Sequence, residues 1–119
     1  MNRTLIFAAL VLILSSGAFA QSDMVKRVAV FHPADTNAVS VQSLKYKVLP
    51  GGQSLSMDIY YPVSFRRDTT HPPVIFVLGY PDSTMLRVIG SKLKDIGAYS
   101  SWARLVASEG LIGINYETQ

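Results

Sequence analysis

The chain has 119 residues, no cysteine and a formal net charge of +3. Its basic residues occur as scattered pairs rather than on one face with interleaved aromatic residues, so we do not expect nucleic-acid binding. A hydrophobic content of 49% excludes a disordered chain. The lack of cysteine excludes both disulfides and a lipid anchor on a terminal cysteine.

The first twenty residues have the pattern of a cleavable secretory signal peptide. Arg3 gives a positive start, an apolar run extends from Leu5 to Leu14, and small residues lead to Ala20. Ser15 interrupts the apolar run well before the about 20 residues that a membrane span needs, so an uncleaved anchor is the less favoured interpretation. We therefore expect a periplasmic or secreted protein, cleaved after Ala20 and without a stable membrane anchor.

Cleavage would leave 99 residues and, without Arg3, a net charge of +2, which suits one small domain. Residues 21–40 hold a short apolar patch, VAVF, and then the polar ADTN segment. We expect this range to be a poorly structured leader, although VAVF has the composition of an edge strand. The folded domain is predicted to cover residues 41–119.

Two runs with period-two alternation are predicted to pair as an antiparallel hairpin. Residues 43–49 alternate apolar side chains with lysines, and residues 54–61 alternate apolar side chains with a mostly polar set. A Pro-Gly-Gly sequence at residues 50–52 supplies the turn. Pro62 ends the second strand because proline cannot donate to the ladder, and a polar loop follows over residues 63–73.

The second half of the chain predicts a parallel strand–helix–strand unit. VIFVL, residues 74–78, is apolar at every position, as is typical of a strand covered on both faces, and LIGIN, residues 111–115, is similar. Between them Trp102 lies in a run with helical spacing, with Ser100 or Ser101 as N-cap and Gly110 at the stop. The connection is expected to be right-handed.

These elements together resemble the N-terminal part of the α/β-hydrolase fold. More narrowly, SLSMDIYYP, PPVIFVLGYPD and YSSWARLVASEGLIGINYE resemble exported esterases of the dienelactone-hydrolase and esterase-lipase kind. The resemblance covers roughly residues 42–117 and only the first third or so of such a domain. It implies an α/β fold with an incomplete sheet, in which an antiparallel hairpin precedes a parallel β-α-β unit.

In that family the loop after the first buried strand contributes backbone N–H groups to the oxyanion hole. Here the matching residues are Leu78, Gly79, Tyr80 and Pro81: Gly79 fits the family pattern, Leu78 replaces a histidine, and Pro81 has no N–H. The resemblance therefore implies that Tyr80 is the backbone donor. The alternative is a simple strand-to-loop turn in which Asp82 bonds local backbone.

The catalytic triad of a serine hydrolase is not in the sequence. The nucleophile commonly lies in a G-x-S-x-G motif, and no serine has glycine at both flanking positions; Ser54 and Ser108 each have one. The family would place this motif beyond the LIGIN strand. We therefore expect no catalytic residue, no metal and no cofactor in this chain.

The remaining polar and aromatic residues have simpler interpretations. His32 and His71 are expected to be ordinary exposed histidines, and no ligand spacing suggests zinc. The three carboxylates that follow or lie on predicted strands are expected to be solvated or to bond backbone groups: Asp58, Asp82 and Glu117. Aromatic residues are expected to cover sheet faces, or in the last case to anchor the helix to the sheet: Tyr46, Tyr60, Tyr61 and Trp102.

The leading expectation is the N-terminal part of an exported serine hydrolase that acts on carboxylic esters or lactones, inactive as this chain alone. The alternative is a small exported binding module that uses the Tyr60-Tyr61 face or an open sheet edge. If the chain stands alone, LIGIN is expected to be an open edge, so that the protein is marginally stable, self-associating or poorly soluble.

Overall fold

In the computed structural model the described residues are 25–27, 39–77 and 79–119. The predicted signal peptide, the VAVF patch, His32 and Leu78 lie outside them. Within the described ranges, every helix is too short or too polar to cross a bilayer.

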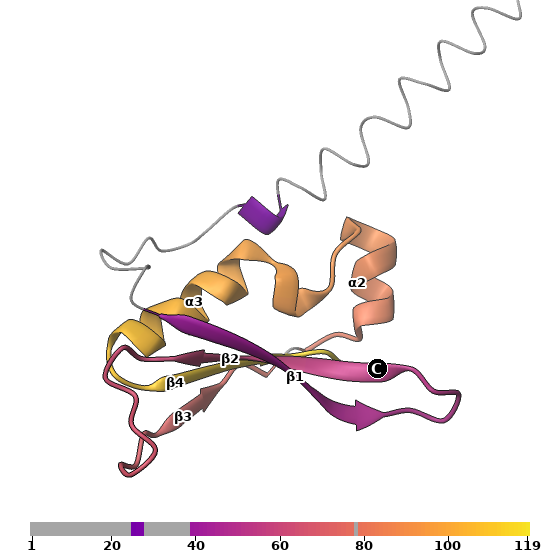
Figure 1. The fold of residues 1–119 in the computed structure, drawn as a ribbon. Coiled ribbons are helices and arrows are strands. Elements are labelled where there is room, and N and C mark those ends of the chain that lie inside the picture. The colour runs from indigo at the N-terminus through magenta and orange to yellow at the C-terminus, as the bar shows by residue number, and fades with distance from the viewer. Residues whose placement is uncertain (1–24, 28–38, 78) are drawn as a thin grey trace, which may run out of the picture.

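The described chain forms a four-stranded mixed sheet with its helices on one face (Figure 1). The elements, in chain order, are β1 (Ser40–Val48), β2 (Ser54–Tyr61), β3 (Pro73–Ile75), α2 (Asp82–Ile89), the 3-10 helix η2 (Leu93–Asp95), α3 (Gly97–Ser108) and β4 (Ile112–Tyr116). The strand order is β1-β2-β4-β3, and β4 is antiparallel to β2 but parallel to β3. The mixed α/β class, the hairpin and the parallel crossover are thus confirmed.

The hairpin has the predicted turn but a longer first strand. β1 begins at Ser40, and Val39 already belongs to the core, so order begins before the expected boundary at residue 41. A bulge interrupts the β1–β2 register between Lys45 and Lys47. Gly51 has a φ of 106°, in the left-handed region that glycine reaches without steric cost.

The crossover helix ends where expected but begins earlier. α3 starts at Gly97, so the predicted N-cap at Ser100 or Ser101 is wrong. Both serine hydroxyls instead donate to carbonyls three residues back within the helix, a use of serine that sequence alone does not distinguish from capping. Gly110, with a φ of 88°, follows the last turn as predicted.

The predictions for the two apolar strands need correction. β4, which contains most of LIGIN, pairs with both β2 and β3, so it is an interior strand and not an open edge. β3 is the edge instead, and it spans only Pro73–Ile75. VIFVL is not covered on both faces either, because Ile75 is 55% exposed and Val77 is 76% exposed.

The helix-covered face of the sheet holds a small core. Tyr60 from β2 packs there with Val39, Ala103 and Ala107, and Phe76 packs against them. α3 crosses β4 closely at Gly113, where an added Cβ would lie 2.5 Å from the Ala103 carbonyl oxygen. Tyr60 belongs to the mostly polar set of alternating residues in β2, so the helices cover the more polar face of this strand.

The opposite face is largely apolar and carries no helix among the described residues (Figure 1). The cross-strand register places these side chains on it: Leu44, Met57, Ile59, Ile75, Ile112, Ile114 and Tyr116. Leu44 and Ile75 count among the exposed large hydrophobic residues, and the others are half-buried. This surface is called the open face below.

Candidate functional site

The Gly79-Tyr80 loop joins the carboxyl end of β3 to α2. Tyr80 is 64% exposed, and its backbone carbonyl oxygen accepts a hydrogen bond from Thr118 Oγ1 at 3.0 Å. Its backbone N–H has no acceptor among the described residues. Because β3 and β4 are parallel, this loop and Thr118 lie beyond the same end of the sheet, where α/β proteins commonly bind ligands.

Asp82 fixes this region from the first residue of α2. It is 4% exposed; Oδ1 accepts the Leu93 backbone N–H and Oδ2 accepts the Thr118 backbone N–H, each at 2.9 Å. The carboxylate does bond backbone groups, but not local ones, so the interpretation of a self-contained turn is wrong. One side chain joins the start of α2, η2 and the segment after β4.

Glu117 is a buried carboxylate in an ion pair. Its Oε1 lies 2.7 Å from Lys92 Nζ, and Ser56 donates to the same carboxylate from both its hydroxyl and its backbone N–H. Burial alone would raise the pKa of Glu117, but the hydrogen bonds from Lys92 and Ser56 more than offset burial and lower the pKa. The residue is therefore ionised at neutral pH.

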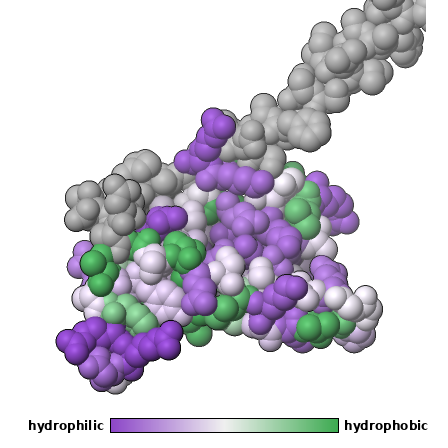
Figure 2. All heavy atoms as spheres, viewed as in Figure 1, coloured by the Kyte–Doolittle hydropathy of each residue, from purple (hydrophilic) through white to green (hydrophobic). Residues whose placement is uncertain are grey.

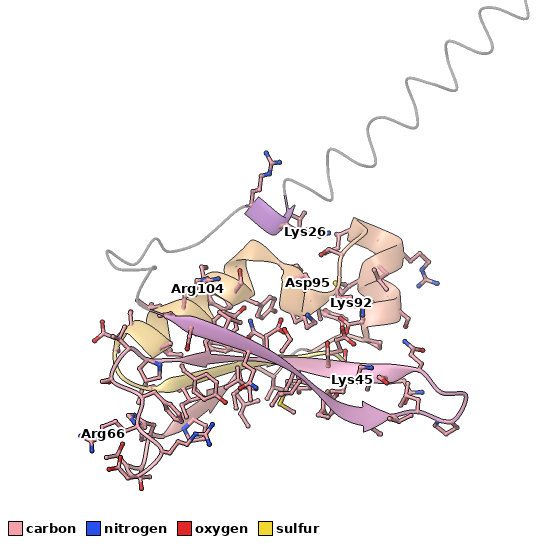
Figure 3. All side chains as sticks on the ribbon, in the orientation of Figure 1. Lys26, Lys45, Arg66, Lys92, Asp95 and Arg104 are labelled. Atoms are coloured by element: carbon pink, nitrogen blue, oxygen red, sulfur yellow. The ribbon has the colours of Figure 1, made fainter. Side chains whose placement is uncertain are left out.

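A second ion pair lies on the same face. Lys94 Nζ lies 3.0 Å from both Asp58 and Asp95, and Asp58 also accepts the Ser43 hydroxyl. Burial alone would lower the pKa of Lys94, but the hydrogen bonds to the two carboxylates raise it. Asp58 is 8% exposed, so the prediction of a solvated carboxylate is wrong. Figure 3 shows Lys92 and Asp95 on the helix side of the sheet.

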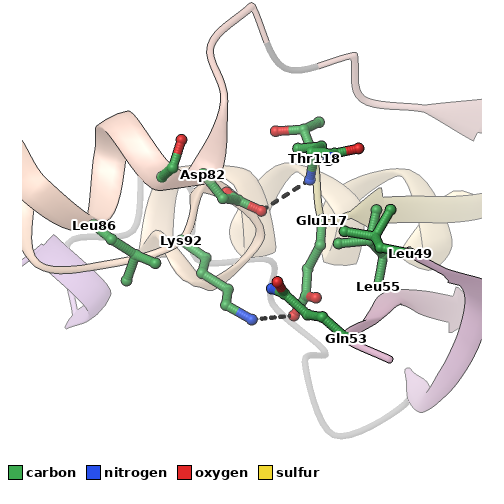
Figure 4. A pocket seen from close by; sticks show the side chains of 10 residues that line it. Leu49, Gln53, Leu55, Asp82, Leu86, Lys92, Glu117 and Thr118 are labelled. Carbon is green, nitrogen blue, oxygen red and sulfur yellow. Dashed lines mark hydrogen bonds and ion pairs between the residues drawn. The ribbon is translucent and has the colours of Figure 1, made fainter. Parts of the chain in front are cut away.

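A cleft of about 170 Å³ opens beside these groups (Figure 4). Its apolar wall is formed by Leu49, Leu55 and Leu86. Its other wall is polar and includes Asp82, Lys92, Glu117 and Thr118. The cleft thus lies between the hairpin turn, α2 and the carboxyl end of β4.

Asn115 is the one large side chain in the described core whose polar atoms are unsatisfied. It is fully buried, and neither its amide nitrogen nor its amide oxygen has a hydrogen bond of good geometry among the described residues, although the Asn115 side chain lies near enough to the Tyr60 hydroxyl to lower the pKa of Tyr60 in part. It lies in β4 opposite Asp58. The apolar LIGIN pattern gave no reason to expect a polar side chain on the covered face, so sequence reasoning missed it.

His71 is held more tightly than an ordinary exposed histidine. Nε2 accepts the Arg66 backbone N–H at 3.3 Å, so Nδ1 carries the proton and donates to the Gly110 carbonyl at 3.2 Å. Its ring packs on Phe65. The contacts tie the 63–73 loop to the end of α3 and give His71 a structural position away from the cleft. The strongly hydrophilic end of this loop protrudes from the body in Figure 2.

The aromatic residues largely cover sheet faces, as expected. Trp102 stacks on Phe76 at 6.2 Å and so joins α3 to the chain beyond β3. Tyr60 is buried, with Arg104 over its ring, whereas Tyr61 follows it on the strand and points to the other face. The Tyr60-Tyr61 binding face predicted for the alternative function therefore does not exist.

Burial raises the pKa of Tyr60, and the nearby Asp58 carboxylate adds to the effect. No group of three metal-ligating side chains occurs in the part of the chain that the structure describes. No family model matches the chain, and neither the curated proteins nor the solved structures contain a significant match to it.

Proposed function

We propose that this chain is the N-terminal part of an exported serine hydrolase of the α/β-hydrolase superfamily, similar to dienelactone hydrolases and esterase-lipases. The observation that carries the proposal is the arrangement in one sheet of an antiparallel hairpin and a parallel crossover, with the Gly79-Tyr80 loop at the carboxyl end of the parallel pair. The substrate would be a carboxylic ester or a lactone, and the chain alone would be inactive.

The chemistry assigned to this part is stabilisation of an oxyanion. Acyl transfer concentrates negative charge on one oxygen in the transition state, and a preorganised N–H donor lowers the energy of that charge. The Tyr80 N–H is the candidate donor, since Pro81 has none. Two contacts support preorganisation: Thr118 Oγ1 holds the Tyr80 carbonyl, and Asp82 holds the Thr118 N–H.

The first test is the DNA downstream of codon 119. A reading frame that continues, directly or after a single-base shift, into a G-x-S-x-G motif is the expected result. A stop codon followed by unrelated sequence in every frame would contradict the proposal. The chain alone should give no turnover of a chromogenic short-chain ester, and serine-inhibitor-sensitive turnover would show that the missing triad was misjudged.

The second test uses the completed enzyme and the backbone of residue 80. Y80P removes the N–H, and Y80A keeps it while removing the exposed ring. Loss of one oxyanion donor is expected to lower kcat by about 10²–10³-fold in Y80P, with Y80A close to the wild type. Equal losses of kcat in the two variants would show that the Tyr80 N–H is not an oxyanion donor.

The second candidate function is a small exported interaction module, and it is favoured by the edge at β3, with which no other described strand pairs. Ile75 and Val77 are exposed there, with no charged residue between His71 and Asp82. The candidates are separated by the same downstream DNA, because a module needs no nucleophile.

A further inference from the structure

The two edges of the sheet differ in their protection against strand pairing. β1 carries Lys45 and Lys47 with a bulge between them, and charges and bulges both discourage the addition of another strand. β3 and the two residues that follow it carry no charge, and among these described residues the one that protects an edge is Pro73, at the first position of the strand. Within the described sheet, β3 is therefore the less protected edge.

On the outer side of β3, backbone hydrogen-bonding groups have no partner in the part of the chain that the structure describes. Ile112 donates to the Pro72 carbonyl and Phe76 donates to the Ile114 carbonyl, so the even-numbered residues of this strand face β4. Residues alternate along a strand, and Ile75 consequently directs its N–H and C=O away from the sheet. Ile75 as a whole is 55% exposed.

We propose that β3 pairs antiparallel with β3 of a second copy of this chain, about a two-fold axis at Ile75. A second copy fits because a two-fold axis places an uncharged strand opposite an uncharged strand, whereas the same pairing through β1 would bring lysines together. The pairing joins two four-stranded sheets into one and makes their open faces continuous. The inference gives the module of the second candidate function its partner, and it does not depend on the hydrolase proposal.

The first experiment measures the mass of the full chain by sedimentation over a range of protein concentrations. The wild-type protein should be in a monomer–dimer equilibrium. I75K places like charges opposite each other and should weaken the dimer on the order of tenfold or more. V48K adds the same charge on β1, at a residue 66% exposed, and should leave the dimer unchanged.

The second experiment guards against a variant that does not fold. The chain has no cysteine, so a single I75C substitution gives one thiol. Directly opposed residues in a hydrogen-bonded antiparallel pair lie about 5.5 Å apart between Cα atoms, within the range of a disulfide. Mild oxidation should therefore cross-link I75C but not V48C.

A wild-type chain that stays monomeric at the highest soluble concentration would overturn the pairing, as would cross-linking of V48C in preference to I75C. Equal weakening by I75K and V48K would overturn it too. None of these results bears on the hydrolase proposal, which depends on the downstream sequence.

Discussion

The carboxylate of Asp82 accepts the backbone N–H of Thr118, 36 residues further along the chain, at 2.9 Å. Its other oxygen accepts the Leu93 N–H. A buried carboxylate that satisfies two distant backbone donors determines how α2, η2 and the end of β4 meet (Figure 4).

We expect D82A to lower the free energy of unfolding by about 2 kcal/mol or more, because it leaves two largely buried N–H groups without an acceptor. Urea denaturation followed by circular dichroism measures the change. S83A, at the exposed neighbour, is the matched control and should have no effect. A D82A protein as stable as S83A would mean that the bonds to Leu93 and Thr118 contribute nothing to folding.

G113A should destabilise the protein by about 1–3 kcal/mol, the usual cost of overpacking. The new methyl group would meet the Ala103 carbonyl at 2.5 Å, so α3 would have to move away from β4. G79A is the control, since its Cβ meets no atom within 4 Å. Thermal unfolding of the two variants side by side gives the comparison, and equal melting temperatures would argue against the close crossing of α3 over β4.

K94M should be among the most damaging single substitutions, with a loss of about 3 kcal/mol or more, because it leaves the Asp58 charge buried without its cation. The double variant D58N/K94M should recover much of the loss. A double-mutant cycle by chemical denaturation measures the coupling, and additive effects would show that the two side chains do not interact.

The free energy of unfolding should fall in acid, partly because Glu117 becomes protonated. Its pKa in the folded protein is below the ordinary value of 4.5, so its contribution is fully present above pH 4.5 and is lost as the pH falls through the lower folded value. E117Q should flatten this part of the profile of unfolding free energy against pH. Wild-type and E117Q profiles that differ only by a constant offset would contradict the lowered pKa of Glu117.

N115L should raise the stability of the protein by about 1 kcal/mol or more, since it removes a fully buried amide that has no hydrogen-bond partner in the described core. Denaturant titration measures the change. A clear loss of stability in N115L would contradict this expectation and would point to the nearby Tyr60 hydroxyl as a partner of the amide.

The sequence was sufficient to predict the hairpin and the parallel crossover, because both depend on local patterns: alternation on either side of a Pro-Gly-Gly turn, and helical spacing that stops at Gly110. It was not sufficient to predict strand order. Which strand becomes an edge depends on the long-range pairing of β4 with β2, and neither LIGIN nor VIFVL contains that information.

The same limit explains the misjudged carboxylates. Asp58 alternates with apolar residues on β2, and such a residue normally faces water. Here η2, a short element without a clear sequence signal, brings Lys94 over that face, so the charge is neutralised by a partner 36 residues away. The alternation of residues along β2 correctly separates its two faces. Which face is covered depends on where the helices pack, and the alternation does not contain that information.

The bond between Asp82 and Thr118 also bears on the order in which the protein is completed during synthesis. A ribosome adds about 5–20 residues per second, so roughly two to seven seconds pass between the synthesis of Asp82 and that of Thr118, whose N–H Asp82 accepts. Over that interval Asp82, in the N-terminal turn of α2, lacks one of the two backbone donors that it accepts in the folded protein.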